Sequence, residues 1–197
     1  APISESGQTT PKYWALRKTL EKYMNGEKQA KVPDMIKSVS IPAFQFTEVA
    51  PLFANLPISQ KDKNIRTMEE YDQGFGSILY RTILPEITSS AQLTVNEAHD
   101  YAQIFIDGKY IGKLDRRNGE KQLTLPACPK GAQLDILVEA MGRINFGRAI
   151  KDYKGITENV ELSINIDGYP FICDLKNWEV FNIEDSYEFY KKMKFHP

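Results

Sequence analysis

The feature that most constrains this chain is a succession of short strand-like runs that begins after Thr67 and fills most of the remaining sequence. Each run is rich in β-branched and aromatic residues and is bounded by turn residues, as is typical of strands. The expected strands are Ser77–Leu84, Ala91–Ala98, Ala102–Leu114 with a central turn, Lys121–Ala127, Gln133–Ala140, Asn159–Gly168 and Trp178–Ile183. No helix-length pattern interrupts them, so the sequence predicts a mainly β fold, an antiparallel β-sandwich or jelly roll.

The clearest local prediction is a β-hairpin in AQIFIDGKYIGKL, residues 102–114. Its centre, Asp107-Gly108, is a dipeptide that two-residue hairpin turns favour. Prolines mark other boundaries: we expect Pro85 to end the strand that begins at Ser77, and Pro126 with Pro129 to end the strand that begins at Lys121.

Helices are expected at the two ends of the chain, and a short one in the segment between the first helix and the strands. Near the N-terminus, Thr10 is suited to cap a helix that begins at Pro11, and Gly26 is suited to stop it. Between this helix and the strands, the sequence predicts a proline-rich segment with a short strand at Ala43–Thr47, a brief amphipathic turn in EVAPLFANL and a polar linker. The tail EDSYEFYKKMKFHP has helical spacing and predicts a short amphipathic helix.

Composition excludes several classes of function. Of 197 residues, 42% are hydrophobic and 26% charged, and the net charge of −1 comes from interleaved acids and bases. With no basic face and no long apolar run, the sequence indicates neither nucleic-acid binding nor a membrane span. Cys128 and Cys173 are too few for a disulfide framework or zinc site, so we expect free thiols, with a single disulfide as the alternative. The N-terminus lacks both a signal-peptide pattern and an initiator Met, which fits Met removal or a chain cut from a longer parent.

Residue types that carry catalysis are scarce. The chain has two histidines; His99 lies between strands, where local hydrogen bonds are expected, and His196 is the penultimate residue. No nucleotide, metal or cofactor motif occurs, and no pair among the acids is singled out for acid–base chemistry. Asp100 and Asp107 lack the neighbouring acids that a calcium site needs. We therefore expect no catalytic residues, no metal and no cofactor in this chain.

The densest polar motif is EAMGRINFG, residues 139–147. If one strand continues from Leu134 to Phe146, its alternate apolar residues, up to Ala140, Ile144 and Phe146, form a core face. Glu139, Arg143 and Asn145 then point the other way. Such a face suits sugar hydroxyls, but an Arg143–Glu139 ion pair or docking on an adjacent domain is favoured, because Gly142 and Gly147 indicate close backbone approach.

Aromatic residues add a second set of candidates for sugar contact. Tyr80 is one of them, and its neighbour Arg81 is included as a contact candidate. The other aromatic candidates are Tyr101, Phe105, Tyr110 and Trp178. A sandwich core uses the same residue types, and the core interpretation is preferred.

Three stretches, MEEYDQGFGSILYRT, AQIFIDGKYIGKLDRRN and LVEAMGRINFGRAIKDYKGIT, resemble in order and spacing the first all-β domain of glycoside hydrolase family 35 β-galactosidases. APISESGQTTPKYWALRKTL is similar to the last loop and helix of the catalytic barrel in that family. The chain departs from the family where Tyr101 follows His99-Asp100 in place of Arg, which puts any contact braced by that Arg in doubt.

The resemblance implies four parts: residues 1–26 from the end of the barrel, 27–67 as a linker, 68–183 as a galactose-binding-domain-like sandwich, and 184–197 as a connector helix to a following domain. It implies a parent that removes terminal β-linked galactose with retention, using two glutamates that would precede Ala1. The expected role is a non-catalytic accessory domain that packs on the barrel and contacts a second β-domain, with a galactose- or galactan-binding module as the alternative. By analogy alone, the parent is expected in the periplasm or outside the cell.

Overall fold

The structure, a computed structural model, describes residues 1–35, 37–148, 150–166 and 168–197. The chain divides into two units, residues 1–46 and residues 47–197, and each is described by itself. No helix among the described residues has the length and apolar character needed to cross a bilayer.

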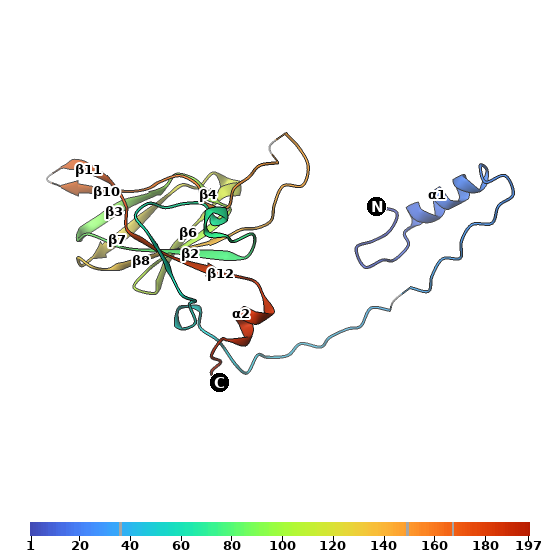
Figure 1. Ribbon diagram of the computed structural model, residues 1–197, viewed down its shortest axis with the longest axis horizontal. Helices are drawn as coiled ribbons and strands as arrows, with labels where there is room; N and C mark the ends of the chain where they lie inside the picture. The colour runs from blue at the N-terminus through green and yellow to red at the C-terminus, as the bar shows by residue number, and fades with distance from the viewer. Residues whose placement is uncertain (36, 149, 167) are drawn as a thin grey trace. The chain divides into compact units, whose positions relative to one another are not determined.

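The second unit is built on a six-stranded antiparallel sheet in the order β1-β12-β2-β8-β5-β6 (Figure 1). Its strands are β1 (Gln60–Asp62), β12 (Trp178–Ile183), β2 (Ser77–Ile83), β8 (Gln133–Glu139), β5 (Tyr101–Ile106) and β6 (Lys109–Asp115). The β5–β6 hairpin forms as the sequence predicts. Asp107 (φ 48°) and Gly108 (φ 74°) both have the positive φ of a type I′ turn.

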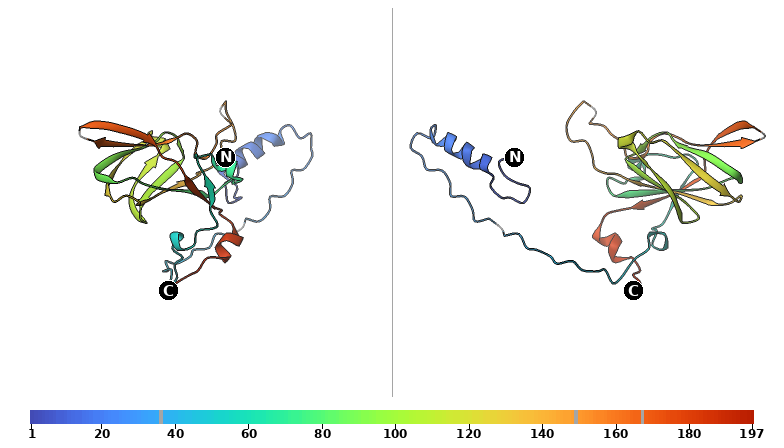
Figure 2. Two further views of the ribbon diagram at one scale, coloured as in Figure 1. Left: turned by 60° about the vertical axis from the view of Figure 1, so that its left-hand side comes forward. Right: turned by 180° about the vertical axis from the view of Figure 1, so that it is seen from behind.

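A second, four-stranded antiparallel sheet has the order β11-β10-β3-β7. Its strands are β11 (Tyr169–Asp174), β10 (Val160–Ile166), β3 (Ile87–Val95) and β7 (Gln122–Cys128). A small two-stranded sheet pairs β4 (Ala98–His99) with β9 (Gly155–Ile156). Figure 2 shows the β10–β11 hairpin extending past the rest of the sandwich. The predicted antiparallel sandwich is confirmed.

The main core lies between the two larger sheets and is filled by alternate residues of their strands. On β8, Leu134, Ile136 and Val138 are fully buried, while their neighbours in sequence point to the other face. Trp178 is 1% exposed and packs edge-to-face against Tyr80. Burial of these large side chains is the main stabilising contribution to the fold.

The outer face of the six-stranded sheet carries a smaller apolar cluster. Leu79, Phe181 and Ile183 form it, and two short helical segments cover it. The first is η1 (Leu52–Ala54), and the second is α2 (Tyr187–Lys191), which supplies Phe189. The expected short helices at both places are therefore present.

The tail returns against the segment that contains η1. Val49 and His196 exchange two backbone hydrogen bonds of 2.8 Å, and the Lys194 backbone N–H donates to Asn55 Oδ1 at 2.6 Å. The tail, residues 184–197, therefore leaves β12 and is then hydrogen-bonded back to the segment around η1.

Three details of the sequence prediction are wrong. Residues 43–47 form no strand, because the described residues offer them no strand to pair with. Pro126 does not end its strand: β7 continues to Cys128, since β7 is at a sheet edge, where a missing N–H is tolerated. The sequence prediction also missed β11, an edge strand that contains Pro170.

Both cysteines are free, as expected. Cys128 lies on β7 and Cys173 on β11, which are the opposite edges of the four-stranded sheet. Three strand spacings, roughly 14 Å in all, separate these edges, which is too far for a disulfide. The alternative of a single bridge is wrong in this structure.

The first unit contains the predicted N-terminal helix, α1 (Pro11–Glu21). Thr10 is at the N-cap, although its hydroxyl donates to the carbonyls of Ala1 and Pro2 rather than capping the helix. No residue of α1 is buried, and Trp14 and Leu20 are about half exposed. The apolar face of this helix is therefore uncovered in the described structure.

Candidate functional site

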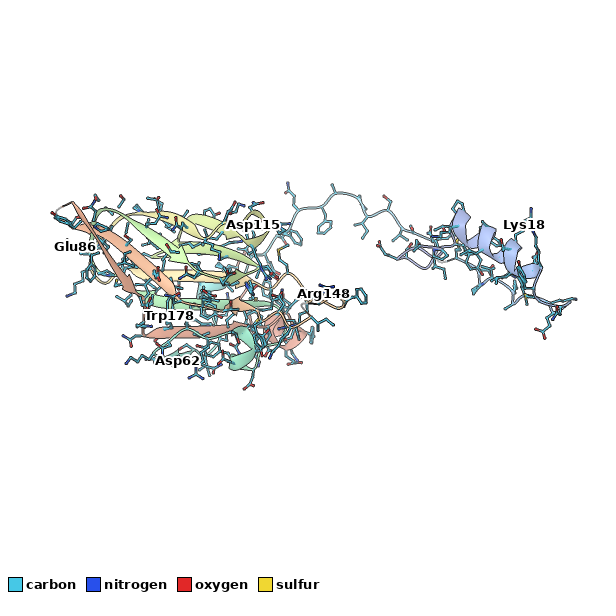
Figure 3. The ribbon with its side chains drawn as sticks, turned by 90° about the horizontal axis from the view of Figure 1, so that it is seen from above. Lys18, Asp62, Glu86, Asp115, Arg148 and Trp178 are labelled. Carbon is cyan, nitrogen blue, oxygen red and sulfur yellow. The ribbon has the colours of Figure 1, made fainter. Side chains whose placement is uncertain are left out.

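The motif at residues 139–147 begins a long loop, residues 140–153, that connects β8 to β9 (Figure 1). In Figure 3 the part of this loop that carries Arg148 projects from the end of the sandwich. We call residues 140–153 the docking loop; residue 149 lies outside the described set.

The expected strand through Phe146 is wrong. Glu139 is the last residue of β8, and it is also where pairing with β2 (at Ser77) and with β5 (at Tyr101) stops. Beyond it the described residues provide no neighbouring strand, and Gly142 turns the chain at φ 125°. Ile144 and Phe146 are consequently exposed, by 41% and 89%, instead of lying in the core.

The start of the docking loop is held by Arg143. Its Nη1 lies 2.6 Å from Glu69 Oε1, and its Nε donates to the Gly74 carbonyl at 2.8 Å. Glu69 belongs to η2 (Met68–Tyr71). The expected Arg143–Glu139 ion pair does not form, because Glu139 instead accepts a hydrogen bond from the Ser77 hydroxyl. Asn145 is exposed at the tip.

The end of the docking loop is held by Lys154, whose side chain is only 2% exposed. Its Nζ lies 2.6 Å from Asp100 Oδ2 and 2.9 Å from Asp152 Oδ2. Its backbone N–H donates to Glu69 at 3.0 Å. Glu69 therefore contacts both ends of the loop, although it precedes Lys154 by 85 positions.

Arg116 completes the group and makes it electrically balanced. Its guanidinium donates to Asp152 twice at 3.0 Å and to Asp100 at 2.8 Å. Two cations thus face two carboxylates, which is the arrangement that part-buried charges require. We call these four residues (Asp100, Arg116, Asp152 and Lys154), together with Glu69 and its partner Arg143, the anchor network.

The pKa values in the anchor network follow from these contacts. The hydrogen bonds from Arg116 are the largest effect on Asp152 and lower its pKa to about 2. Burial by itself would raise the pKa of Asp100, but hydrogen bonds from Lys154 and Arg116 outweigh it and lower that pKa. Both carboxyl groups are therefore held in their charged form.

His99 makes the local contacts that the sequence predicts. Its Nδ1 lies 2.6 Å from the Tyr153 carbonyl, and its Nε2 lies 3.3 Å from Glu97. The imidazole therefore helps to hold the end of the docking loop. Asp100 is committed to cations, and no group of three or more His, Cys, Asp or Glu side chains in the described ranges is placed to hold a metal.

The exposed part of the docking loop is apolar and cationic. Met141, Phe146, Ile150 and Tyr153 are each exposed by 44% or more. Arg148 and Lys151 lie among them, and no acidic residue occurs between positions 140 and 151. An exposed apolar group of this kind is typical of a surface that contacts another protein or domain.

The other predicted contact residues lie elsewhere. Tyr80 is fully buried; its hydroxyl donates to the Arg66 carbonyl at 3.0 Å and accepts from the Ile156 N–H at 3.2 Å. It is a core residue, which agrees with the preferred core interpretation, and it is not accessible as an interdomain or sugar contact. Arg81 points to the outer face, where its Nε lies 2.7 Å from Asp135 and its guanidinium covers the Phe181 ring.

The aromatic residues named beside them divide between the core and the outer face. Trp178 is buried, which agrees with the preferred core interpretation. Phe105 packs edge-to-face against Phe53 and Tyr110 on the outer face of the sheet. These rings are therefore distributed over two faces rather than gathered in one sugar platform.

Comparison with known proteins agrees with this architecture. The family described as "Beta-galactosidase, first all-beta domain" matches residues 66–184. Beta-galactosidase from Bos taurus is 36% identical over 200 residues, covering 93% of this chain and 28% of that protein. The Homo sapiens protein is 36% identical over 198 residues, covering 93% of this chain and 27% of its own length.

A more distant relative gives the same result. Beta-galactosidase 1 from Dictyostelium discoideum is 31% identical over 215 residues, covering 91% of this chain and 32% of that protein. The chain thus spans about three tenths or less of the length of the Bos taurus and Homo sapiens relatives that it matches. With the family match extending over η2, the docking loop and every strand of the two large sheets except β1, the chain belongs to the family of the first all-β domain of β-galactosidase.

Proposed function

We propose that this chain is the accessory β-domain of a β-galactosidase, and that its docking loop packs on the catalytic barrel beside the mouth of the active site. The observation that carries this proposal is the loop itself. Both of its ends are fastened by the anchor network, whereas its apolar middle is left exposed. A loop that is fixed in place but uncovered is suited to contact a neighbouring surface.

The chemistry of the site favours a structural role in holding the docking loop over a catalytic role. A glycosidase needs one carboxyl group with a raised pKa beside a second carboxylate. Here Asp100 and Asp152 are brought together by two cations that lower both pKa values. These acids are therefore suited to hold the docking loop rather than to donate a proton to a leaving group.

The first unit supports the same assignment. Helix α1 exposes Trp14, Leu16 and Leu20, which would be covered if residues 1–26 belong to the end of the barrel. We propose residues 27–67 as the connection, 68–183 as the sandwich and 184–197 as the link to a second β-domain. The contact between the tail and the segment around Asn55 would then set the direction in which the chain leaves the sandwich.

The proposal predicts that the purified chain does not hydrolyse a chromogenic β-galactoside and that the parent enzyme depends on the loop. In the parent, Phe146→Ser is expected to lower the temperature of half-inactivation by roughly 3 °C or more, because an interface aromatic is lost. Tyr169→Ser is the matched control, since Tyr169 is 78% exposed on the β10–β11 hairpin, at the other end of the sandwich.

Turnover by the chain alone, or equal effects of the two substitutions, would contradict the proposal. Calorimetry with galactose and galactan tests the alternative of a sugar-binding module. Two observations count against that alternative: Tyr80 is buried in the core, and Arg143 is committed to Glu69 and Gly74. Saturable heat that disappears in Arg143→Ala would restore it.

A further inference from the structure

A cleft of about 420 Å³ lies beside the first residues of the docking loop. Its apolar wall consists of Phe75, Met141 and Tyr190, each about half exposed. Its acidic residues are Glu139, Glu184 and Asp185, which come from β8 and from the segment after β12. We call these six residues the acidic cleft. None of the residues that line it is basic.

The side chains of the acidic cleft offer hydrogen-bond acceptors but no free donor. The two hydroxyl groups in its lining are already donating: Ser77 to Glu139, and Tyr190 to Asp185 at 2.7 Å. What remains are carboxylate oxygens, which only accept. A ligand that matches this set must supply hydrogen-bond donors and must not need a donor in return. A protein cation meets both conditions, whereas a sugar hydroxyl needs both a donor and an acceptor to be fully hydrogen-bonded.

Three residues that line the cleft are held together by a buried glutamine that is not itself part of the lining. Gln73 is 2% exposed, and its Nε2 lies 2.8–3.2 Å from the carbonyls of Phe75, Ser77 and Ile183. The Gln73 amide oxygen is buried without a hydrogen-bond partner among the described residues. Gly76 lies so close to Ile183 that a Cβ would meet its carbonyl at 2.6 Å. The cleft is therefore built by the fold rather than left between loose surface side chains.

Negative charge converges on one point of this cleft. The hydrogen bond to Asp185 is the largest reason why the pKa of Tyr190 is raised, and the charges of Asp185 and Glu139 add to it. Of the basic residues close in sequence, Lys191 places its Nζ over the Tyr187 ring, and Arg143 is committed to Glu69 and the Gly74 carbonyl. Lys192 and Lys194 line a neighbouring pocket with Glu184, but among the described residues no ion pair within 4.0 Å engages Glu139, Glu184 or Asp185. Carboxylates without an ion-pair partner favour a positively charged ligand.

We propose that the acidic cleft receives an arginine side chain presented by the domain on which the docking loop packs. The identity of that domain rests on the proposed function. Arginine fits better than lysine, because its planar guanidinium can lie against Phe75 or Tyr190 while its five N–H donors meet the carboxylates. Because the cleft begins at Met141, an arginine there would extend the contact made by the docking loop.

The test is an NMR titration of the ¹⁵N-labelled 197-residue chain with N-acetyl-arginine amide. We expect saturable shifts confined to the cleft, at Gly76, Gly142 and Tyr190, with half-saturation in roughly the millimolar range of weak binding. The neutral isostere N-acetyl-citrulline amide is expected to cause none. A Glu139→Gln, Glu184→Gln double variant should weaken binding at least about threefold, whereas Glu86→Gln, an exposed acid outside the cleft, should not.

Absence of localised shifts, or an equal response to the citrulline amide, would overturn the proposal. Galactose binding at the same residues would overturn it in favour of a sugar site. The peak dispersion of each variant shows whether it is folded. Because this titration needs no barrel, it can succeed when the loop substitutions in the parent have no effect. The two proposals can therefore fail separately.

Discussion

Two connections of the sandwich use glycine at positive φ, but they are held in different ways. The β5–β6 turn has two central residues, Asp107 and Gly108, and the dipeptide itself favours the observed conformation. The docking loop also contains glycines at positive φ, yet its position depends on Glu69, Asp100 and Arg116, which are distant in sequence. The first connection is specified locally, and the second only by the completed fold.

The largest expected effect distinguishes the glycines of these two connections. At Gly155, where the docking loop rejoins the sheet, a Cβ would lie 2.2 Å from the Tyr80 hydroxyl and φ is +81°. Gly155→Ala should therefore cost roughly 3 kcal/mol or more in the free energy of unfolding. At Gly108 a Cβ meets nothing within 4 Å, so Gly108→Ala should cost only about 1 kcal/mol, from its positive φ. Urea denaturation of both variants measures the difference, and equal losses would contradict it.

The next effect comes from the buried lysine. Lys154→Met leaves Asp100 with Arg116, and Asp152 with Arg116 and the His99 imidazole, so we expect a loss of roughly 3 kcal/mol. Lys121→Met is the matched control, because Lys121 is 49% exposed and its pair with Glu97 is expected to contribute less than about 1 kcal/mol. If the control were as destabilising as Lys154→Met, the burial of Lys154 would not explain how much the anchor network stabilises the fold.

Acid should weaken the anchor network. The folded pKa of Asp152 is about 2, below its ordinary value of 3.8, so its contribution is present above pH 4. That contribution should be lost as the pH falls from about 4 to about 2, when the carboxylate becomes protonated in the folded state. Urea midpoints at several pH values test this, and Asp152→Asn should flatten the dependence in that window. An unchanged slope in the variant would show that other groups cause it.

The smallest effect is expected at Glu69. Glu69→Gln removes the charge that pairs with Arg143, where both side chains are partly exposed, so the loss should be about 1 kcal/mol. Amide exchange in residues 141–148 should become faster, because the loop start is less firmly held. Exchange at the β5–β6 turn should not change. Acceleration at both places would indicate general destabilisation instead.

The sequence could predict what depends on near neighbours. Local rules predict the Asp107-Gly108 turn, the start of helix α1 at Pro11, and most of the strands as hydrophobic runs along the chain. On β2, however, both faces are apolar: Tyr80 points into the core and Leu79 into the outer cluster. Alternation alone could not say which face was inside, and so Tyr80 stayed a contact candidate beside its preferred core interpretation.

The candidate site was only partly predictable for the same reason. Glu139, Arg143 and Asn145 were found because they share one motif, yet their geometry was wrong. The length of β8 depends on where β2 and β5 end, and the partner of Arg143 is Glu69. No local pattern signals that Glu69 and Lys154 meet, or that Asp100, Arg116 and Asp152 lie around that lysine. The resemblance of MEEYDQGFGSILYRT to the family was the only sign that the region of Glu69 matters.

The central claim is that the docking loop is fixed by the sandwich and covered by the catalytic barrel. Hydrogen exchange in residues 141–148 and 150–151, compared between this chain and the full-length parent enzyme, tests it most directly. We predict at least about tenfold slower exchange in the parent, because covering the loop removes its amides from water, with little change at the β5–β6 turn. Equal exchange of the loop in the two proteins would contradict the account.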